Sequence, residues 1–270
     1  MIPFLHLGPL TIPTFGLMVA TALLVSAYVL QADFNRRRSQ IEKLPDYKSQ
    51  RDEGFLIIGI AGIAGLVGAR LYHVLETPKE FFADPWPQLW TRYGFAWFGG
   101  FLGGLIALII LARWMKIPLL LFLDICSPAA CVGYAIGRIG CLLSGDGDYG
   151  TPTSLPWGMS FPNGVVPTTQ HVHPTPIYEF FIWTAIAAFL WRLGSKSLGK
   201  PTAPGEVFSG YLILTGIARF LMEFIRINPR SFFGLSNAQA ASLFSIVVGL
   251  VLLLSLRTKK AEPEPAGARS

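Results

Sequence analysis

Long apolar segments alternate with short polar ones along the whole 270-residue chain. Each apolar segment is about 17 to 25 residues long, which is the length of a helix that crosses the hydrocarbon core of a bilayer. The segment that separates the fourth and fifth apolar runs, residues 144–173, is rich in proline and lacks a helical pattern. We therefore predict an irregular loop region there and seven membrane-spanning helices, at residues 14–30, 54–75, 95–114, 119–143, 174–193, 207–227 and 238–256.

The composition agrees with an all-α, polytopic membrane protein. The chain is 52% hydrophobic and 14% charged, whereas a soluble domain carries roughly 25% charged residues. We expect one transmembrane domain at residues 1–257 and a disordered cytoplasmic tail at residues 258–270, where "AEPEPAGARS" has few apolar residues.

Basic residues follow the first, third, fifth and seventh predicted spans. Because positive loops stay in the cytoplasm, this pattern predicts an outer N-terminus, a cytoplasmic C-terminus and an outer location for residues 144–173. The net charge of +6 is thus explained by membrane topology, and we expect no nucleic-acid partner.

The three cysteines, Cys126, Cys131 and Cys141, lie in or beside an apolar segment without CxxC or Cys/His spacing. This arrangement suggests neither a zinc site nor a disulfide framework. We expect no metal and no cofactor. Buried small apolar side chains are the simplest interpretation for Cys126 and Cys131.

Ionisable residues inside the predicted spans call for a partner or a function, because each costs about 2.5 to 3.5 kcal/mol at membrane depth. Arg219 and Glu223 are four residues apart and can pair on one face of a helix. Arg70 and Arg138 lie near the outer ends of their spans, where an arginine can extend to the interface. The alternative is that several arginines converge on an anion such as a phospholipid headgroup, which a guanidinium binds bidentately.

Two further motifs admit both a structural and a functional interpretation. The glycines of "FGGFLGG" (Phe98 to Gly104) allow close helix packing, or contact between a lipid and the backbone. In "HVHPTPIYEF" (His171 to Phe180), the histidines are either hydrogen-bonding loop residues or proton carriers at the interface.

Taken together, the motifs resemble those of the bacterial prolipoprotein diacylglyceryl transferases. The segment "GRIGCLLSGDGDYG" (Gly137 to Gly150) is similar to the signature of that family, and "HPTPIYEF" resembles its helix start with a His-Pro and a Tyr-Glu pair. The segment "GEVFSGYLILTGIARFLMEFIR" (Gly205 to Arg226) resembles its Arg-Phe-x-x-Glu-Phe-x-Arg helix, and "GLVGAR" and "TFGLM" align in order. The resemblance covers nearly the whole chain.

The resemblance implies an enzyme of the bacterial inner membrane. Such enzymes transfer the diacylglyceryl group of phosphatidylglycerol to the lipobox cysteine thiol of a prolipoprotein and release glycerol-1-phosphate. The implied partners are phosphatidylglycerol, the lipobox segment and membrane lipids. The implied catalytic residues are Arg138, Arg219 and Glu223, and the implied substrate-binding residues are Arg70, Gly99, Gly100, Gly137, Gly140, Asp146, Gly150, His173 and Arg226.

Four positions depart from the family pattern. A family histidine, asparagine and two tyrosines are replaced here by Phe98, Cys141, Phe15 and Thr215, and the signature contains one extra residue. One hypothesis is an active transferase in which His171, His173, Asp146 or Asp148 handles the thiol proton. Two alternatives are a transferase of the same fold with another acceptor, even with a covalent intermediate on Cys141, and a lipid-binding protein without catalysis.

Overall fold

The apolar segments fold into helices. The computed structural model describes residues 1–48, 52–76, 97–196, 203–230 and 234–261, together with residues 78, 81 and 86, and these residues contain seven helices and four short strands. They divide into two units, which are treated separately: unit 1 is Met1–Val25 with Leu123–Ser270, and unit 2 is Ser26–Phe122.

In unit 2, a stripe of small residues joins helices α2 (Glu53–Glu76) and α5 (Trp97–Trp114). A Cβ atom on Gly99 would collide with the carbonyl oxygen of Gly68 and with the side chain of Tyr72. A Cβ atom on Gly100 would lie 3.4 Å from the carbonyl oxygen of Gly65. The glycines of "FGGFLGG" therefore allow two helix backbones to approach closely, which supports the packing interpretation of this motif.

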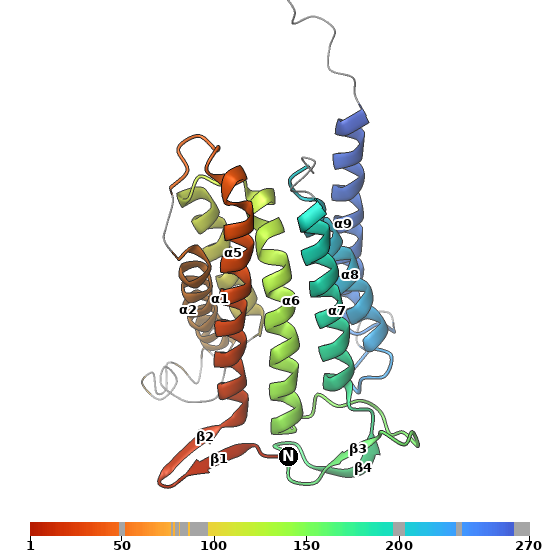
Figure 1. Cartoon of the computed structure of the whole chain (residues 1–270). Coiled ribbons are helices and arrows are strands. Elements are labelled where there is room, and N and C mark those ends of the chain that lie inside the picture. Colours follow the sequence, from red (N-terminus) through yellow and green to blue (C-terminus); the bar gives the residue numbers. More distant parts are fainter. Residues whose placement is uncertain are drawn as a thin grey trace, which may run out of the picture. The chain divides into compact units, whose positions relative to one another are not determined.

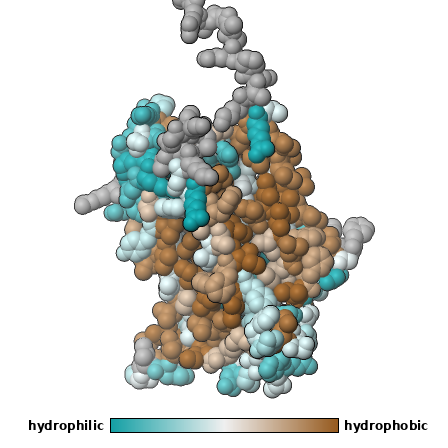
Figure 2. Space-filling model, turned by 45° about the vertical axis from the view of Figure 1, so that its right-hand side comes forward, coloured by the Kyte–Doolittle hydropathy of each residue, from teal (hydrophilic) through white to brown (hydrophobic). Residues whose placement is uncertain are grey.

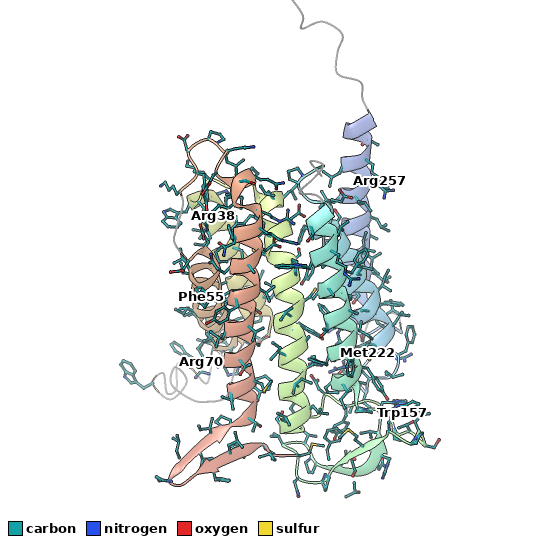
Figure 3. All side chains as sticks on the ribbon, viewed as in Figure 1. Arg38, Phe55, Arg70, Trp157, Met222 and Arg257 are labelled. Carbon is teal, nitrogen blue, oxygen red and sulfur yellow. The ribbon has the colours of Figure 1, made fainter. Side chains whose placement is uncertain are left out.

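The polar end of unit 2 contains a buried carboxylate network. Glu53 is fully buried and accepts hydrogen bonds from Arg38 (Figure 3), Tyr47 and Gln31. These bonds satisfy its charge, as burial of a carboxylate requires. The second half of α1 (Thr14–Ile41) supplies Arg38 and Gln31 to this network.

Unit 1 combines helices with two small hairpins. The helices are the start of α1, then α6 (Leu119–Ser144), α7 (Thr175–Lys196), α8 (Glu206–Met222) and α9 (Asn237–Ala261). The antiparallel hairpins are β1–β2 (Phe4–Leu7 and Leu10–Pro13) and β3–β4 (Met159–Phe161 and Thr168–Val172). Figure 1 shows both hairpins at the end of unit 1 where α6 ends and α7 begins.

A buried carboxylate from α6 determines where α8 begins. Gly205 precedes α8 with a positive φ of 108° and provides no side-chain cap. Instead, Asp124 accepts hydrogen bonds from the backbone N–H groups of Gly205 (2.7 Å) and Phe208 (2.6 Å). Asp124 thus performs from a neighbouring helix the task that an N-cap side chain performs locally.

Helix lengths and the exposed surface identify a multi-pass membrane protein. Five helices within the described residues are long and apolar enough to cross a membrane, and the apolar helical stretch Gly99–Trp114 is shorter. Many large apolar side chains stay exposed on these helices, and Figure 2 shows them as the brown surface. A surface of this kind is expected to face lipid. The number of spans and the side of each terminus remain predictions.

The structure differs from the expected elements in several places, and α1 extends to Ile41 instead of ending near residue 30. Residues 144–173, which we expected to be irregular, contain β3–β4, and residues 4–13 form β1–β2. Their strands have three to five residues, too few for a clear period-2 pattern. Helix α8 ends at Met222 rather than at residue 227. Helix α9 continues to Ala261, so residues 258–261 of the expected disordered tail are helical, and residues 262–270 lie outside the described residues.

Candidate functional site

Three arginines from different parts of unit 1 converge on one buried glutamate. Glu179, in the second turn of α7, has a side chain that is 1% exposed. Its carboxylate accepts hydrogen bonds from Arg138 Nε at 2.6 Å and from the Nη1 atoms of Arg219 and Arg226, both at 3.4 Å. Tyr134 also donates its hydroxyl to Glu179 at 3.2 Å. Glu179 is therefore the central acceptor of what we call the arginine cluster: Arg138, Arg219 and Arg226 with Asp148, Glu179 and Glu223.

Asp148 bridges two of the three arginines from the loop that follows α6. Arg138 Nη1 donates to one carboxylate oxygen at 2.6 Å, and Arg226 Nη2 donates to the other. The side chain of Asp148 is 33% exposed, whereas those of Arg138 and Arg226 are 11% and 5% exposed. Burial raises the pKa of Asp148, but the charges of the two arginines outweigh that effect, so its pKa lies below the ordinary value.

Arg219 and Glu223 form the ion pair that their spacing predicts. Arg219 Nη2 lies 2.9 Å from Glu223 Oε2, and Asn228 donates a hydrogen bond of 2.7 Å to Glu223 Oε1. Arg219 is the most exposed arginine of the cluster, at 23%. Because three carboxylates face three guanidinium groups, the formal charge of the cluster is zero.

Helical geometry presents Arg138 to the cluster. Tyr134, Arg138 and Cys141 are spaced i, i+4 and i+7 on α6 and so share one face. The ring of Tyr134 lies 5.4 Å from the Arg138 guanidinium carbon and stacks on Trp183 of α7. These contacts hold the guanidinium toward Glu179.

A close backbone contact brings Asp148 and Arg226 together. Gly150 and Arg226 form an antiparallel bridge, and the next N–H group, from Thr151, donates to the Ile225 carbonyl at 2.8 Å. A Cβ atom at position 150 would lie 2.5 Å from the Ile225 carbonyl oxygen and 2.9 Å from His173 Cβ. Gly150 therefore has a packing role at this contact. Arg226 reaches the cluster from this bridge and not from α8, although the predicted span included it.

Asp146 and Cys141 lie beside the cluster. Burial raises the pKa of the Asp146 carboxyl above its ordinary value, and its Oδ1 accepts a hydrogen bond from the backbone N–H of Asp148. The Cys141 sulfur accepts a hydrogen bond of 3.3 Å from Arg138 Nη1. The loop thus contains two carboxylates in opposite environments: Asp148 is stabilised as an anion, while Asp146 is more readily protonated.

The end of α6 and the loop that follows it contain the described group that comes nearest to a metal-ligand set. One ligand atom each from Cys141, Asp146 and Asp148 lie within 4.8 Å of one another. Arg138 already donates to both Cys141 and Asp148, and Arg226 also donates to Asp148. This positive charge opposes binding of a further cation, so we assign no metal to the group.

His173 makes a separate set of contacts at the start of α7. Its Nδ1 lies 3.3 Å from the hydroxyl of Tyr178, which also accepts a hydrogen bond of 2.8 Å from Trp157 Nε1. Trp157, labelled in Figure 3, is 56% exposed at the hairpin end of unit 1. Among the described residues, His173 bonds to Tyr178 and to the backbone of Gly150, Thr151 and Thr175.

The remaining predicted site residues are Arg70 and several glycines. Arg70, Gly99 and Gly100 belong to unit 2, and the two glycines are in helix–helix contacts. Gly140 packs against the start of α1, where its Cβ would lie 3.1 Å from Met18 Cβ, whereas a Cβ on Gly137 would meet no atom within 4 Å.

Sequence reasoning did not place Glu179 in the site, although a carboxylate in an apolar span is a signal for a functional or paired group. From the sequence, Asp148 is one of four proton-handling candidates and one of two candidates for the acidic position of the signature, without an arginine partner. The bond of Asp148 to two arginines depends on the tertiary fold.

An apolar groove of about 360 Å³ lies between α7 and α8. Its lining includes Ile182, Ile186, Leu214, Ala218, Met222 and Ile225. Ile182 is three residues after Glu179 on α7, and Met222 is three residues after Arg219 on α8, so each is a helical neighbour of a cluster residue. Met222 is labelled in Figure 3.

Comparison with known proteins agrees with this combination of anion-binding and apolar features. The family model described as prolipoprotein diacylglyceryl transferase matches residues 3–255. A phosphatidylglycerol–prolipoprotein diacylglyceryl transferase of Clostridium tetani is 31% identical, with 91% of this chain and 94% of the relative covered. Relatives of the same name from Trichormus variabilis and Cupriavidus metallidurans are 31% and 33% identical, with 94% and 93% of this chain and 89% and 91% of those proteins covered. The chain belongs to the prolipoprotein diacylglyceryl transferase family.

Proposed function

We propose that this chain transfers the diacylglyceryl group of phosphatidylglycerol to the lipobox cysteine thiol of a prolipoprotein. The observation that carries the proposal is the convergence of Arg138, Arg219 and Arg226 in one cluster. A phosphate is the leaving group of this reaction, and guanidinium groups stabilise the charge that develops on it. Arginine holds a phosphate with two parallel hydrogen bonds and keeps its charge at every physiological pH.

Arg219 is the arginine that we assign to the first contact with the lipid headgroup. Its side chain is more exposed than those of Arg138 and Arg226, and it adjoins Ala218 of the apolar groove. Glu223 holds one Nη group of Arg219, which orients the guanidinium. The groove between α7 and α8 supplies an apolar surface for a lipid tail whose phosphate is at Arg219.

The reaction exchanges one bond for another at a glycerol carbon of the lipid. A carbon–sulfur bond forms to the lipobox cysteine as the bond from the same carbon to a phosphate oxygen breaks. The electron pair of the broken bond stays on glycerol-1-phosphate, and the thiol proton passes to a base. The arginine cluster forms no covalent bond in this reaction. Its role is to bind the phosphate and stabilise its charge.

Asp146 is our candidate for the proton acceptor. Its pKa is raised by burial, and a base is most efficient when its pKa approaches the working pH. Asp148 is less suited, because two arginines stabilise its anion. The two histidines are also less suited as the proton acceptor, because His173 contacts Tyr178 and His171 is exposed.

We further propose that the protein lies in the bacterial inner membrane with both hairpins on the outer face. The support is the distribution of basic residues, which leaves the hairpin end of unit 1 on the non-basic side. Arg257, labelled in Figure 3, is exposed near the opposite end of α9. This orientation places the arginine cluster where exported prolipoproteins meet the membrane.

The test is transfer of labelled diacylglyceryl from phosphatidylglycerol to a synthetic lipobox peptide. The variants are Arg138→Ala and Arg219→Ala, and the matched control is Arg257→Ala. We expect the wild type and the control to form the thioether, and each cluster variant to lose at least about 100-fold in rate, which is the typical cost of removing a group that stabilises the developing charge. A wild-type protein that binds the lipid without forming product would instead indicate a lipid-binding protein.

A further inference from the structure

The three carboxylates of the arginine cluster are not equivalent. Glu179 and Glu223 have side chains that are 1% and 2% exposed, and each belongs to a helix or its last turn. Asp148 lies on a loop and is 33% exposed. It is therefore the carboxylate of the cluster that a molecule from outside can most readily replace.

Hydrogen bonds fix the backbone around Asp148, whereas its side chain is held by its bonds to the arginines. Thr175 donates a hydrogen bond to the Asp148 carbonyl, and the Asp148 N–H group donates to Asp146. Gly147 has a φ of +92°, a conformation that favours glycine. Rotation of the Asp148 side chain can thus break its bonds to Arg138 and Arg226 without any movement of α6 or α7.

The two bonds of Asp148 are the bonds that a phosphate would form. One carboxylate oxygen accepts from Arg138 and the other from Arg226, and two oxygens of a phosphate can bridge the same donors. With Asp148 in place the cluster is neutral, as three carboxylates balance three arginines. A phosphate that enters beside Asp148 would add an uncompensated negative charge to the cluster. A phosphate monoanion that takes the place of the Asp148 carboxylate would leave the cluster neutral.

We propose that the Asp148 carboxylate and the phosphate of the substrate or product compete for Arg138 and Arg226. This inference rests on the proposed function for the identity of the phosphate ligand. Asp148 lowers the affinity of the site for phosphate and so assists the release of glycerol-1-phosphate. That product carries more negative charge than the phosphodiester of the lipid, and without a competitor it would stay bound to the arginines.

The expected change in phosphate affinity follows from the fraction of molecules in which Arg138 and Arg226 are not bound to Asp148. If Asp148 holds both arginines in roughly nine molecules of ten, the apparent affinity for a phosphate is lowered roughly tenfold. Replacement of Asp148 by asparagine removes the negative charge at nearly constant size. We therefore expect Asp148→Asn to bind glycerol-1-phosphate about tenfold more tightly than the wild type.

The experiment measures binding of glycerol-1-phosphate to the full-length protein in detergent by calorimetry, without any thiol acceptor. The matched control is Glu206→Gln, which removes a carboxylate charge in the first turn of α8, outside the arginine cluster. Asp148→Glu retains the competing charge. We expect tighter binding for Asp148→Asn alone, and affinities within about threefold of the wild type for the other two variants. Equal or weaker binding by Asp148→Asn would overturn the proposal.

Two further readouts keep the test decisive. If Asp148→Asn is less stable, addition of glycerol-1-phosphate should raise its unfolding midpoint more than that of the wild type, because at one ligand concentration a ligand that binds the folded state more tightly stabilises it more. A smaller rise would contradict the competition. Because binding is measured without transfer, a wild type that forms no thioether refutes the proposed function and leaves this result intact. A wild type that transfers while Asp148→Asn binds no more tightly refutes only the competition.

Discussion

Glu179 is the residue on which we expect the arginine cluster to depend most. It is 1% exposed and accepts hydrogen bonds from Tyr134 and from all three arginines. The shortest of these, from Arg138 Nε at 2.6 Å, is a charge-assisted bond. Glu179→Gln would keep the size of the side chain, remove its charge and leave three arginines opposite two carboxylates.

The expected cost is large because the arginines would remain in a partly buried site. Removal of one partner of a buried ion pair typically destabilises a protein by about 3 to 5 kcal/mol. The amide oxygen of glutamine can still accept from one or two donors, but its NH₂ group would face another donor. We therefore expect a loss near the lower end of this range, about 3 kcal/mol.

The assay is unfolding of the full-length protein by increasing amounts of denaturing detergent, followed by the helical circular dichroism signal. The matched control is Glu206→Gln, a half-buried glutamate in the first turn of α8, where loss of the charge should cost below about 1 kcal/mol. If Glu179→Gln unfolds at the same detergent fraction as the wild type, the cluster does not stabilise the fold and our reasoning is refuted.

Three further predictions concern other parts of the chain. Asp124→Ala should destabilise the start of α8 by about 1 to 2 kcal/mol and accelerate hydrogen exchange at the Gly205 and Phe208 amides; unchanged exchange would exclude the cap. Gly99→Ala should destabilise the α2–α5 contact. Gly59→Ala should be neutral or stabilising, because an added Cβ at Gly59 would meet no atom within 4 Å. The detergent-unfolding midpoints of the two variants are compared, and equal midpoints would argue against close packing at Gly99. Because the folded-state pKa of Asp148 is depressed, its contribution to stability is present above its unfolded-state pKa, near about 4, and disappears as the pH falls through the lower folded value. Asp148→Asn should therefore show a smaller loss of unfolding midpoint between about pH 6 and pH 3 than the wild type, and an equal loss would contradict this assignment.

The local ion pair and the helices were predictable because their signals lie within one segment. Arg219 and Glu223 are four residues apart, and that spacing alone brings them together on a helix. The glycines near Gly99 have the small-residue pattern of a close helix contact, and the structure places them in one. Long apolar runs likewise indicate membrane helices without any tertiary information.

The convergence of the cluster was not predictable in the same way. Arg138 and Glu179 are 41 residues apart in the chain, and Arg226 and Asp148 are 78 apart. Their bonds depend on how α6, α7 and α8 pack and on the bridge between Gly150 and Arg226. The span predicted at residues 207–227 carried Arg226 on a helix, whereas the helix ends at Met222 and the arginine enters from the bridge.

The sequence by itself thus determined that this protein is helical, lies in a membrane and carries arginines in or beside its apolar segments, because hydrophobicity and helical spacing are properties of short segments. It also determined the resemblance to the transferase family, because the motifs lie in the expected order. Only the tertiary structure decided which carboxylate each arginine meets. A charge in a low-dielectric site takes its state from the few groups within bonding distance, and those groups come together here from segments that are far apart in the chain.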